Sequence, residues 1–185
     1  MQTNTETGRL DSWFARPYAE ALIGRSYQLF LGGDLDGAGA ACDGALHINP
    51  GHPRALALKS IVLTYQGRVD EALLAAGEAM CSDVAAGLSF AARGIALARR
   101  GELSEAIIDC EYAVALAPSC PISNYVAAYC WARLDQEDRC RERLTRAFEL
   151  AGGLRGRACG EDEAVFGNYK EDDWFTELTG GFKPR

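Results

Sequence analysis

The chain has 185 residues, of which 48% are hydrophobic, and its formal net charge is −7 at pH 7. This length suits a single domain, and the acidic balance argues against a general nucleic-acid binder and against binding to anionic membranes. The polar N-terminus, and the lack of an apolar run near the roughly 18 residues of a membrane helix, predict no signal peptide, no membrane insertion and a cytoplasmic location.

Residues 1–18 precede the first periodic part of the chain. We expect this stretch to be flexible apart from a short turn at 11–14, whose aromatic side chains Trp13 and Phe14 would cover the first repeat unit. A repeat array needs such a cover because its terminal unit has no neighbour on one side.

Similar residues recur every 34 positions from about residue 19 onward. Self-similarity at this period is typical of helical solenoids, in which each unit is one pair of helices. The strongest series are the glycines Gly33, Gly67 and Gly101 and the alanines Ala45, Ala79, Ala113 and Ala147. The sequence therefore predicts four helix–turn–helix units, over residues 19–52, 53–86, 87–120 and 121–152.

The second unit shows the signals expected for both helices of a pair. Its first helix is predicted from Pro53 to Gln66, because proline suits a first helical position and Gly67 suits a left-handed exit. Its second helix is predicted over residues 71–81, with the Asp70 side chain as the N-terminal cap. Capping residues recur at this position in the other units: Asp36, Ser104 and Asp138.

Three stretches carry the pattern of a known repeat. Residues 45–50 (Ala-Leu-His-Ile-Asn-Pro) and 113–118 (Ala-Val-Ala-Leu-Ala-Pro) end the second helix of a unit alike, and residues 101–106 (Gly-Glu-Leu-Ser-Glu-Ala) form the turn before it. They resemble the tetratricopeptide repeat. The resemblance covers residues 19 to 152 and is weakest in the fourth unit. The resemblance implies an all-α, right-handed superhelical solenoid with a concave groove lined by the first helices.

The resemblance also implies which side chains face that groove. They are Tyr27, Phe30, Leu58, Ile61, Tyr65, Ile95, Arg99, Tyr125, Tyr129 and Arg133. Tyrosine suits interfaces because it joins apolar area to a polar group, and the arginines at one end predict an acidic ligand. The Lys, Asn and Arg set with which some members of the family grip a C-terminal carboxylate is absent. The alternative interpretation is that several of these side chains pack between repeats.

Residues 153–185 come after the last unit and begin with a glycine-rich break. An acidic stretch at 161–163 comes next, and then a short aromatic helix is predicted near Glu171 to Leu178. We expect this helix to cap the fourth repeat or to lie in the groove, because its aromatic area needs burial. The alternatives are a docking segment for another chain, with self-association through Trp174 and Phe175, and a plug that can be displaced from the groove.

No catalytic constellation is present, since the chain has only two histidines and no nucleotide-binding or hydrolase motif. The seven cysteines include no Cys-x-x-Cys pair, so we interpret them as reduced side chains packed like small hydrophobic residues. We expect no enzyme activity, no metal and no cofactor.

The sequence predicts a non-enzymatic scaffold that binds a peptide or helix of a partner protein in the concave groove. Two alternatives stay open at this point. One is a small chaperone of a bacterial secretion system, and the other is a self-assembling structural protein.

Overall fold

The computed structural model describes residues 7–82 and 86–180, with side chains from residue 15 onward. The array consists of α1 (Thr7–Leu31), α2 (Leu35–Ile48), α3 (Pro53–Tyr65), α4 (Val69–Ala79), α5 (Ala86–Arg100), α6 (Leu103–Leu116), α7 (Pro121–Arg133) and α8 (Glu137–Leu150). The C-terminal segment, residues 152–180, holds α9 (Leu154–Cys159), α10 (Glu163–Phe166), the 3-10 helix η2 (Gly167–Tyr169) and α11 (Asp173–Thr179). Among the described helices, none is both long and apolar enough to cross a membrane.

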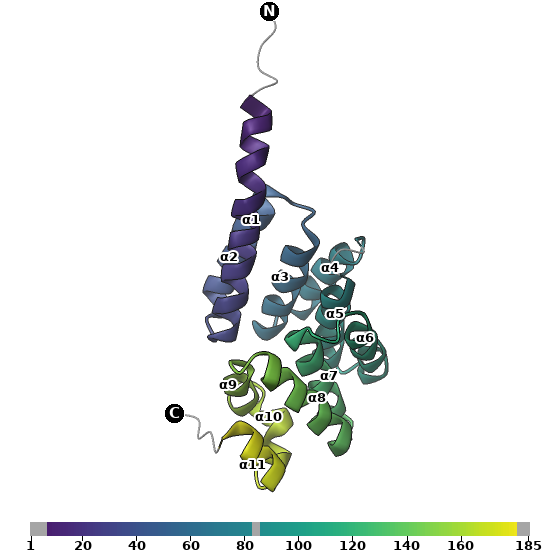
Figure 1. Ribbon diagram of the computed structural model, residues 1–185. Coiled ribbons are helices and arrows are strands. Elements are labelled where there is room, and N and C mark those ends of the chain that lie inside the picture. The colour runs from purple at the N-terminus through teal and green to yellow at the C-terminus, as the bar shows by residue number, and fades with distance from the viewer. Residues whose placement is uncertain (1–6, 83–85, 181–185) are drawn as a thin grey trace, which may run out of the picture.

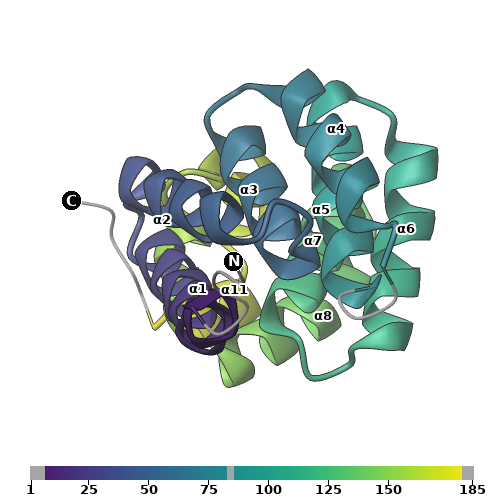
Figure 2. The ribbon, with the colours of Figure 1, turned by 90° about the horizontal axis from the view of Figure 1, so that it is seen from above.

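The eight helices of the array pair in chain order, so that α1, α3, α5 and α7 are the first helices of the four units. Neighbouring pairs lie side by side and turn progressively along the array (Figure 1). Seen from above, α3, α5 and α7 lie on the inside of the curve, with α4 and α6 outside them (Figure 2). The predicted right-handed helical solenoid is confirmed.

Each unit turns between its helices on a residue with a left-handed backbone. The φ angle is +85° at Gly33, +80° at Gly67 and +96° at Gly101, and Asp135 takes the same conformation at +53°. Glycine reaches this region without a side-chain clash, and aspartate is one of the few other residues that tolerate it. The turns therefore recur every 34 residues in the structure as they do in the sequence.

The second helix of each unit begins two residues earlier than predicted. The N-terminal caps are Asp34, Arg68, Glu102 and Gln136. The prediction with Asp70 was wrong because the left-handed residue Gly67 already redirects the chain, so the next residue, Arg68, is the cap and the helix begins at Val69. Asp70 lies instead in the first turn of α4, where a negative charge interacts favourably with the helix dipole.

Helix α1 contains more of the chain than predicted. It begins at Thr7, so residues 11–14 belong to a continuous helix and not to a separate turn. Pro17 lies within this helix without ending it, because it removes one backbone hydrogen bond while most residues around it favour helix. The side chains of Trp13 and Phe14 lie outside the described residues, so their role as a cover stays a prediction.

Small side chains let the two helices of a unit approach closely. In the first unit, Ser26 Oγ lies 3.0 Å from Cys42 Sγ. At the same position of the third unit, a Cβ added to Gly94 would lie 2.6 Å from Cys110 Sγ. Both cysteines are free and buried, and burial raises the pKa of each thiol. They pack as small hydrophobic side chains, in agreement with the sequence.

The C-terminal segment folds back on the array, and the glycine-rich stretch contains α9 instead of an extended break. Helix α10 packs on α7, and α11 packs on α8. Figure 1 shows the segment, in yellow-green, next to α8. The predicted C-terminal capping helix is present as α11. Trp174 and Phe175 are buried within their own chain, so in this structure they offer no exposed surface for self-association.

Candidate functional site

The concave face has an open half and a half that the C-terminal segment covers. The ten predicted groove residues are distributed unevenly between these two halves. Tyr27 and Leu58 line an open pocket, whereas Ile61 and Ile95 are fully buried in the core. Arg133 is exposed at the edge and donates to the Ala98 carbonyl at 3.4 Å. The remaining five contact the C-terminal segment: Phe30, Tyr65, Arg99, Tyr125 and Tyr129. The concave face is therefore open only in part. The C-terminal segment, which we expected either to cap the fourth repeat or to lie in the groove, covers the rest.

The C-terminal segment covers the part of the concave face that contains Tyr65, Arg99 and Tyr125, which we call the closed half. At its centre lies the carboxylate of Asp162, which is 1% exposed. The hydroxyl groups of Tyr65 and Tyr125 each donate to Asp162 Oδ2 at 2.8 Å. Arg99 Nη2 donates to Asp162 Oδ1 at 2.5 Å. Because these donors come from α3, α5 and α7, three successive units of the array converge on one acidic group.

Burial controls the electrostatics of this cluster. It raises the pKa of Asp162, while Arg99 and the hydrogen bonds from the two tyrosines act in the opposite direction. Burial, and then the charge of Asp162, raise the pKa of Tyr65 and Tyr125 well above the ordinary tyrosine value. Both hydroxyls therefore remain protonated donors at neutral pH.

One helical turn after Asp162, the ring of Phe166 fills the rest of the closed half. Phe166 is fully buried, and its centroid lies 5.8 Å from that of Tyr125 and 6.2 Å from that of Tyr129. Phe175 stacks on the same ring, with the two centroids 6.5 Å apart. Asp162 and Phe166 thus give the C-terminal segment one polar and one apolar anchor.

Arg157 ties the same segment to the first unit. Its Nη2 donates to the Phe30 carbonyl at 2.6 Å, and its guanidinium lies 3.9 Å from the Phe30 ring centroid and 4.3 Å from that of Tyr65. Glu161 forms an ion pair with it. The C-terminal segment therefore reaches from the fourth unit, which precedes it in the chain, to the end of α1.

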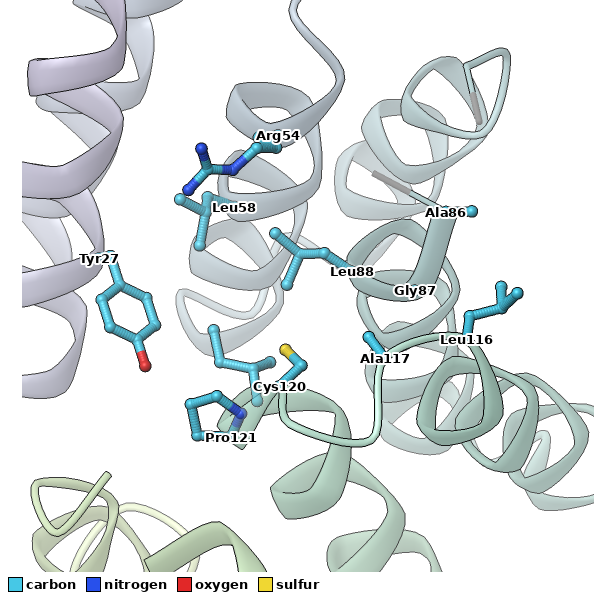
Figure 3. A pocket seen from close by; sticks show the side chains of 11 residues that line it. Tyr27, Arg54, Leu58, Ala86, Gly87, Leu88, Leu116, Ala117, Cys120 and Pro121 are labelled. Atoms are coloured by element: carbon cyan, nitrogen blue, oxygen red, sulfur yellow. The ribbon is translucent and has the colours of Figure 1, made fainter. Parts of the chain in front are cut away.

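The open half lies toward the N-terminal ends of α3, α5 and α7. It contains a pocket of about 440 Å³, which Figure 3 shows between Tyr27 of α1, Leu58 of α3, Leu88 of α5 and the Cys120–Pro121 corner. The lining is mostly apolar. Arg54, at the rim, is half-exposed and forms an ion pair with Glu20 at 3.0 Å.

Comparison with solved structures identifies the fold. No protein-family model matches the sequence, and no curated protein is similar to it in sequence. TTC0263, a thermophilic TPR protein of Thermus thermophilus, aligns with a TM-score of 0.58 and 17% identity over 88% of this chain and 97% of its own. PilF of Pseudomonas aeruginosa aligns with a TM-score of 0.58 and 16% identity, over 92% of this chain and 79% of its own. The chain has the tetratricopeptide-repeat (TPR) fold.

A third structure with this fold, of Naa15/Naa10 bound to HypK-THB, aligns with a TM-score of 0.55 and 17% identity. It covers 90% of the present chain, which spans only 26% of the matched protein. At these identities the likeness concerns the TPR fold alone.

Sequence reasoning missed several residues of the TPR concave face. Asp162 lies in an acidic stretch, which ordinarily indicates a solvated surface, and Arg157 lies among glycines. The one available signal was chemical: arginines among the groove residues predict an acidic ligand, and Asp162 is such a ligand. Arg54 and Leu88, in the open half, occupy equivalent positions of two successive repeats. This position is not among those from which the groove residues were predicted.

Proposed function

We propose that this TPR protein is a non-enzymatic scaffold that binds a segment of a partner protein on its concave face. The observation that carries the proposal is the open pocket between Tyr27, Leu58 and Leu88. All four units contribute to its lining, which also includes Ile122, so it is a surface that only the assembled solenoid offers. An apolar pocket on a concave surface is the usual setting for the anchoring side chain of a bound helix or peptide.

The lining indicates the kind of side chain that binds there. Leu58, Leu88 and Ile122 supply apolar area, and Tyr27 adds a ring with a polar edge. A leucine, methionine or phenylalanine of the partner would fill this space. The half-exposed Arg54 at the rim would favour a partner with an acidic residue beside its anchor.

Structural precedent supports the same proposal. One protein with this fold is bound to another polypeptide, HypK-THB, in its solved structure. Repeat solenoids generally bind through extended concave surfaces, because their curvature exposes many side chains to one elongated ligand.

The proposal is tested by site-specific photo-crosslinking in the native cell. A benzophenone amino acid replaces Tyr27 in the pocket, and in the matched control it replaces Leu74, which is 70% exposed on α4 outside the concave face. We expect a discrete protein adduct from position 27 that position 74 does not give. Leu88→Glu, which places a charge in the pocket, should abolish that adduct. An identical pattern from both positions, or no adduct from position 27, contradicts the proposal.

A narrower role, as a chaperone of a bacterial secretion system, is decided by the identity of the crosslinked partner. A secreted protein supports that role, whereas a protein that stays in the cytoplasm contradicts it. Fractionation of the same cells tests the cytoplasmic location predicted from the sequence.

A further inference from the structure

The closed half contains a buried carboxylate with charged and hydroxyl donors, which a purely structural cover does not require. Covering the end of a solenoid takes apolar area, which Phe166, Trp174 and Phe175 already supply. Burying the carboxylate of Asp162 adds a desolvation cost that this cover does not need. Converging charged and hydroxyl donors, in contrast, are what recognition of an acidic group requires.

The donors around Asp162 are fixed in place by the array itself. The Arg99 guanidinium lies 4.7 Å from the ring centroid of Tyr65 and 5.4 Å from that of Tyr129. Tyr125 is held between the helices and is 2% exposed. Since these side chains are ordered by residues of the repeats, the site is preorganised for a carboxylate, which lowers the entropy cost of binding one.

The C-terminal segment is an imperfect ligand for this site. Arg99 donates through Nη2, yet its buried Nε finds no hydrogen-bond acceptor within the described part of the chain. Guanidinium and carboxylate groups pair best through two parallel hydrogen bonds. A ligand that offered acceptors to both nitrogens would therefore bind Arg99 better than Asp162 does.

We propose that the closed half is a recognition site for a helical segment of a partner protein, and that the C-terminal segment is its built-in competitor. The segment recognised would carry an aspartate or glutamate and, four residues later, an aromatic side chain. That spacing is the one by which Asp162 reaches Tyr65 and Tyr125 while Phe166 packs against Tyr129. This site is distinct from the open pocket and does not depend on whether that pocket binds a partner.

Tethering explains how such competition works. A segment joined to its own site by a short linker acts at a millimolar effective concentration. An outside segment of equal intrinsic affinity therefore binds the intact chain weakly and binds well only when the tethered one is weakened. Gly152 and Gly153, at the start of the segment, give the backbone there the freedom that release requires.

The experiment measures binding of a labelled segment to the full chain. The probe is a fluorescein-labelled synthetic peptide of residues 152–180, followed by fluorescence anisotropy. In the released variant, Asp162→Ala/Phe166→Ala, both anchors of the tethered segment are lost. We expect this variant to bind the probe at least tenfold more tightly than the wild type. Arg99→Ala, added to the released variant, should weaken binding at least tenfold.

Two matched controls define specificity. A probe carrying the same two alanines should bind the released variant at least tenfold more weakly than the unmodified probe. Glu163→Gln removes an exposed acid beside Asp162 and should leave probe binding as in the wild type. If the released variant binds no better than the wild type, or if it binds both probes alike, the proposal is wrong.

Two further measurements keep the test decisive if the released variant does not fold. In hydrogen exchange of the wild type, amides of α9 to α11 should open while α5 and α7 stay protected. Exchange of the segment only together with α5 and α7 would overturn the proposal, because the segment would then be part of the indivisible fold. The wild type should also sediment as a monomer, whereas a dimer that the two alanines dissociate would indicate exchange of segments between copies and overturn it.

Discussion

The two halves of the concave face are built on the same helices but differ in what covers them. The open half, around Leu58 and Leu88, is apolar and keeps a pocket of about 440 Å³. The closed half, around Tyr65 and Arg99, is polar and holds Asp162. Buried hydroxyl and guanidinium groups need acceptors, whereas apolar side chains do not. The repeat thus fixes the positions of the side chains, whereas their chemistry decides whether the surface they form must be covered.

Among the substitutions that compare the two halves, Phe166→Ala should reduce the free energy of unfolding most. The ring is fully buried against two tyrosines and Phe175, so its loss should reduce the free energy of unfolding by about 3–5 kcal/mol. Phe90→Ala is the control: Phe90 is half-buried and touches Tyr112, and its loss should cost about 1 kcal/mol. Urea denaturation measures both. Equal costs would show that the closed half is no better packed than the outer surface.

A smaller loss of stability is expected from a substitution in α5, the helix that both halves share. Helix α5 supplies Leu88 to the open half and Arg99 to the closed half, and Gly94 between them faces Cys110. Gly94→Ala would place a Cβ 2.6 Å from that sulfur and should destabilise the protein by about 1–3 kcal/mol through overpacking.

The matched control for this substitution is Gly77→Ala in α4, where an added Cβ meets nothing within 4 Å. It should stabilise the protein by about 0.5–1 kcal/mol, because alanine favours helix over glycine. Thermal or urea unfolding distinguishes the two signs. Stabilisation by both substitutions would mean that the close approach of α5 and α6 is not needed.

A third prediction compares two tyrosines of the concave face. Tyr125→Phe removes one donor from the buried carboxylate of Asp162 and should cost about 1–2 kcal/mol. Tyr27→Phe removes a hydroxyl at the open pocket and should change stability by about 0.5 kcal/mol or less. Chemical denaturation of the two variants in parallel measures the contrast. Similar costs would show that the hydroxyl of Tyr125 contributes no more to stability than one next to solvent.

The repeats could be predicted because the signals that define them are local. Gly33, Gly67 and Gly101 are required where the backbone is left-handed, and Ala113 and its equivalents are required where helices meet. Such constraints recur at a fixed spacing and are visible in one sequence. The helix starts were missed by two residues because an aspartate inside the first turn resembles a cap.

The closed half could not be predicted because it depends on contacts between distant parts of the chain. Asp162 lies 63 residues from Arg99 and 97 from Tyr65 in sequence. Nothing in the acidic stretch at 161–163 distinguishes a buried carboxylate from a solvated one. Only the path of the C-terminal segment, set by α9 and its glycines, decides which carboxylate enters the array.

The smallest effect concerns pH and the charge of Asp162. Burial raises the pKa of this carboxyl in the folded protein, so the folded state binds its proton more tightly than the unfolded chain does. This contribution to stability is present below the ordinary aspartate pKa of about 3.9. It is lost as the pH rises through the folded pKa. The effect should be small because Arg99 and the tyrosine hydroxyls offset much of the cost of burial.

Urea unfolding of the wild type and of Asp162→Asn, from about pH 4 to about pH 7, isolates this group from the other acids. The asparagine does not titrate, so the stability of the wild type relative to the variant should fall as the pH rises. The exposed Glu71 and Glu102, whose pKa values are lowered by their arginine partners, affect both proteins equally and cancel. A relative stability that rises with pH would mean that Arg99, Tyr65 and Tyr125 overcompensate burial. The closed half would then favour the charged form of the Asp162 carboxyl over its neutral form, as expected of a site built to bind a carboxylate.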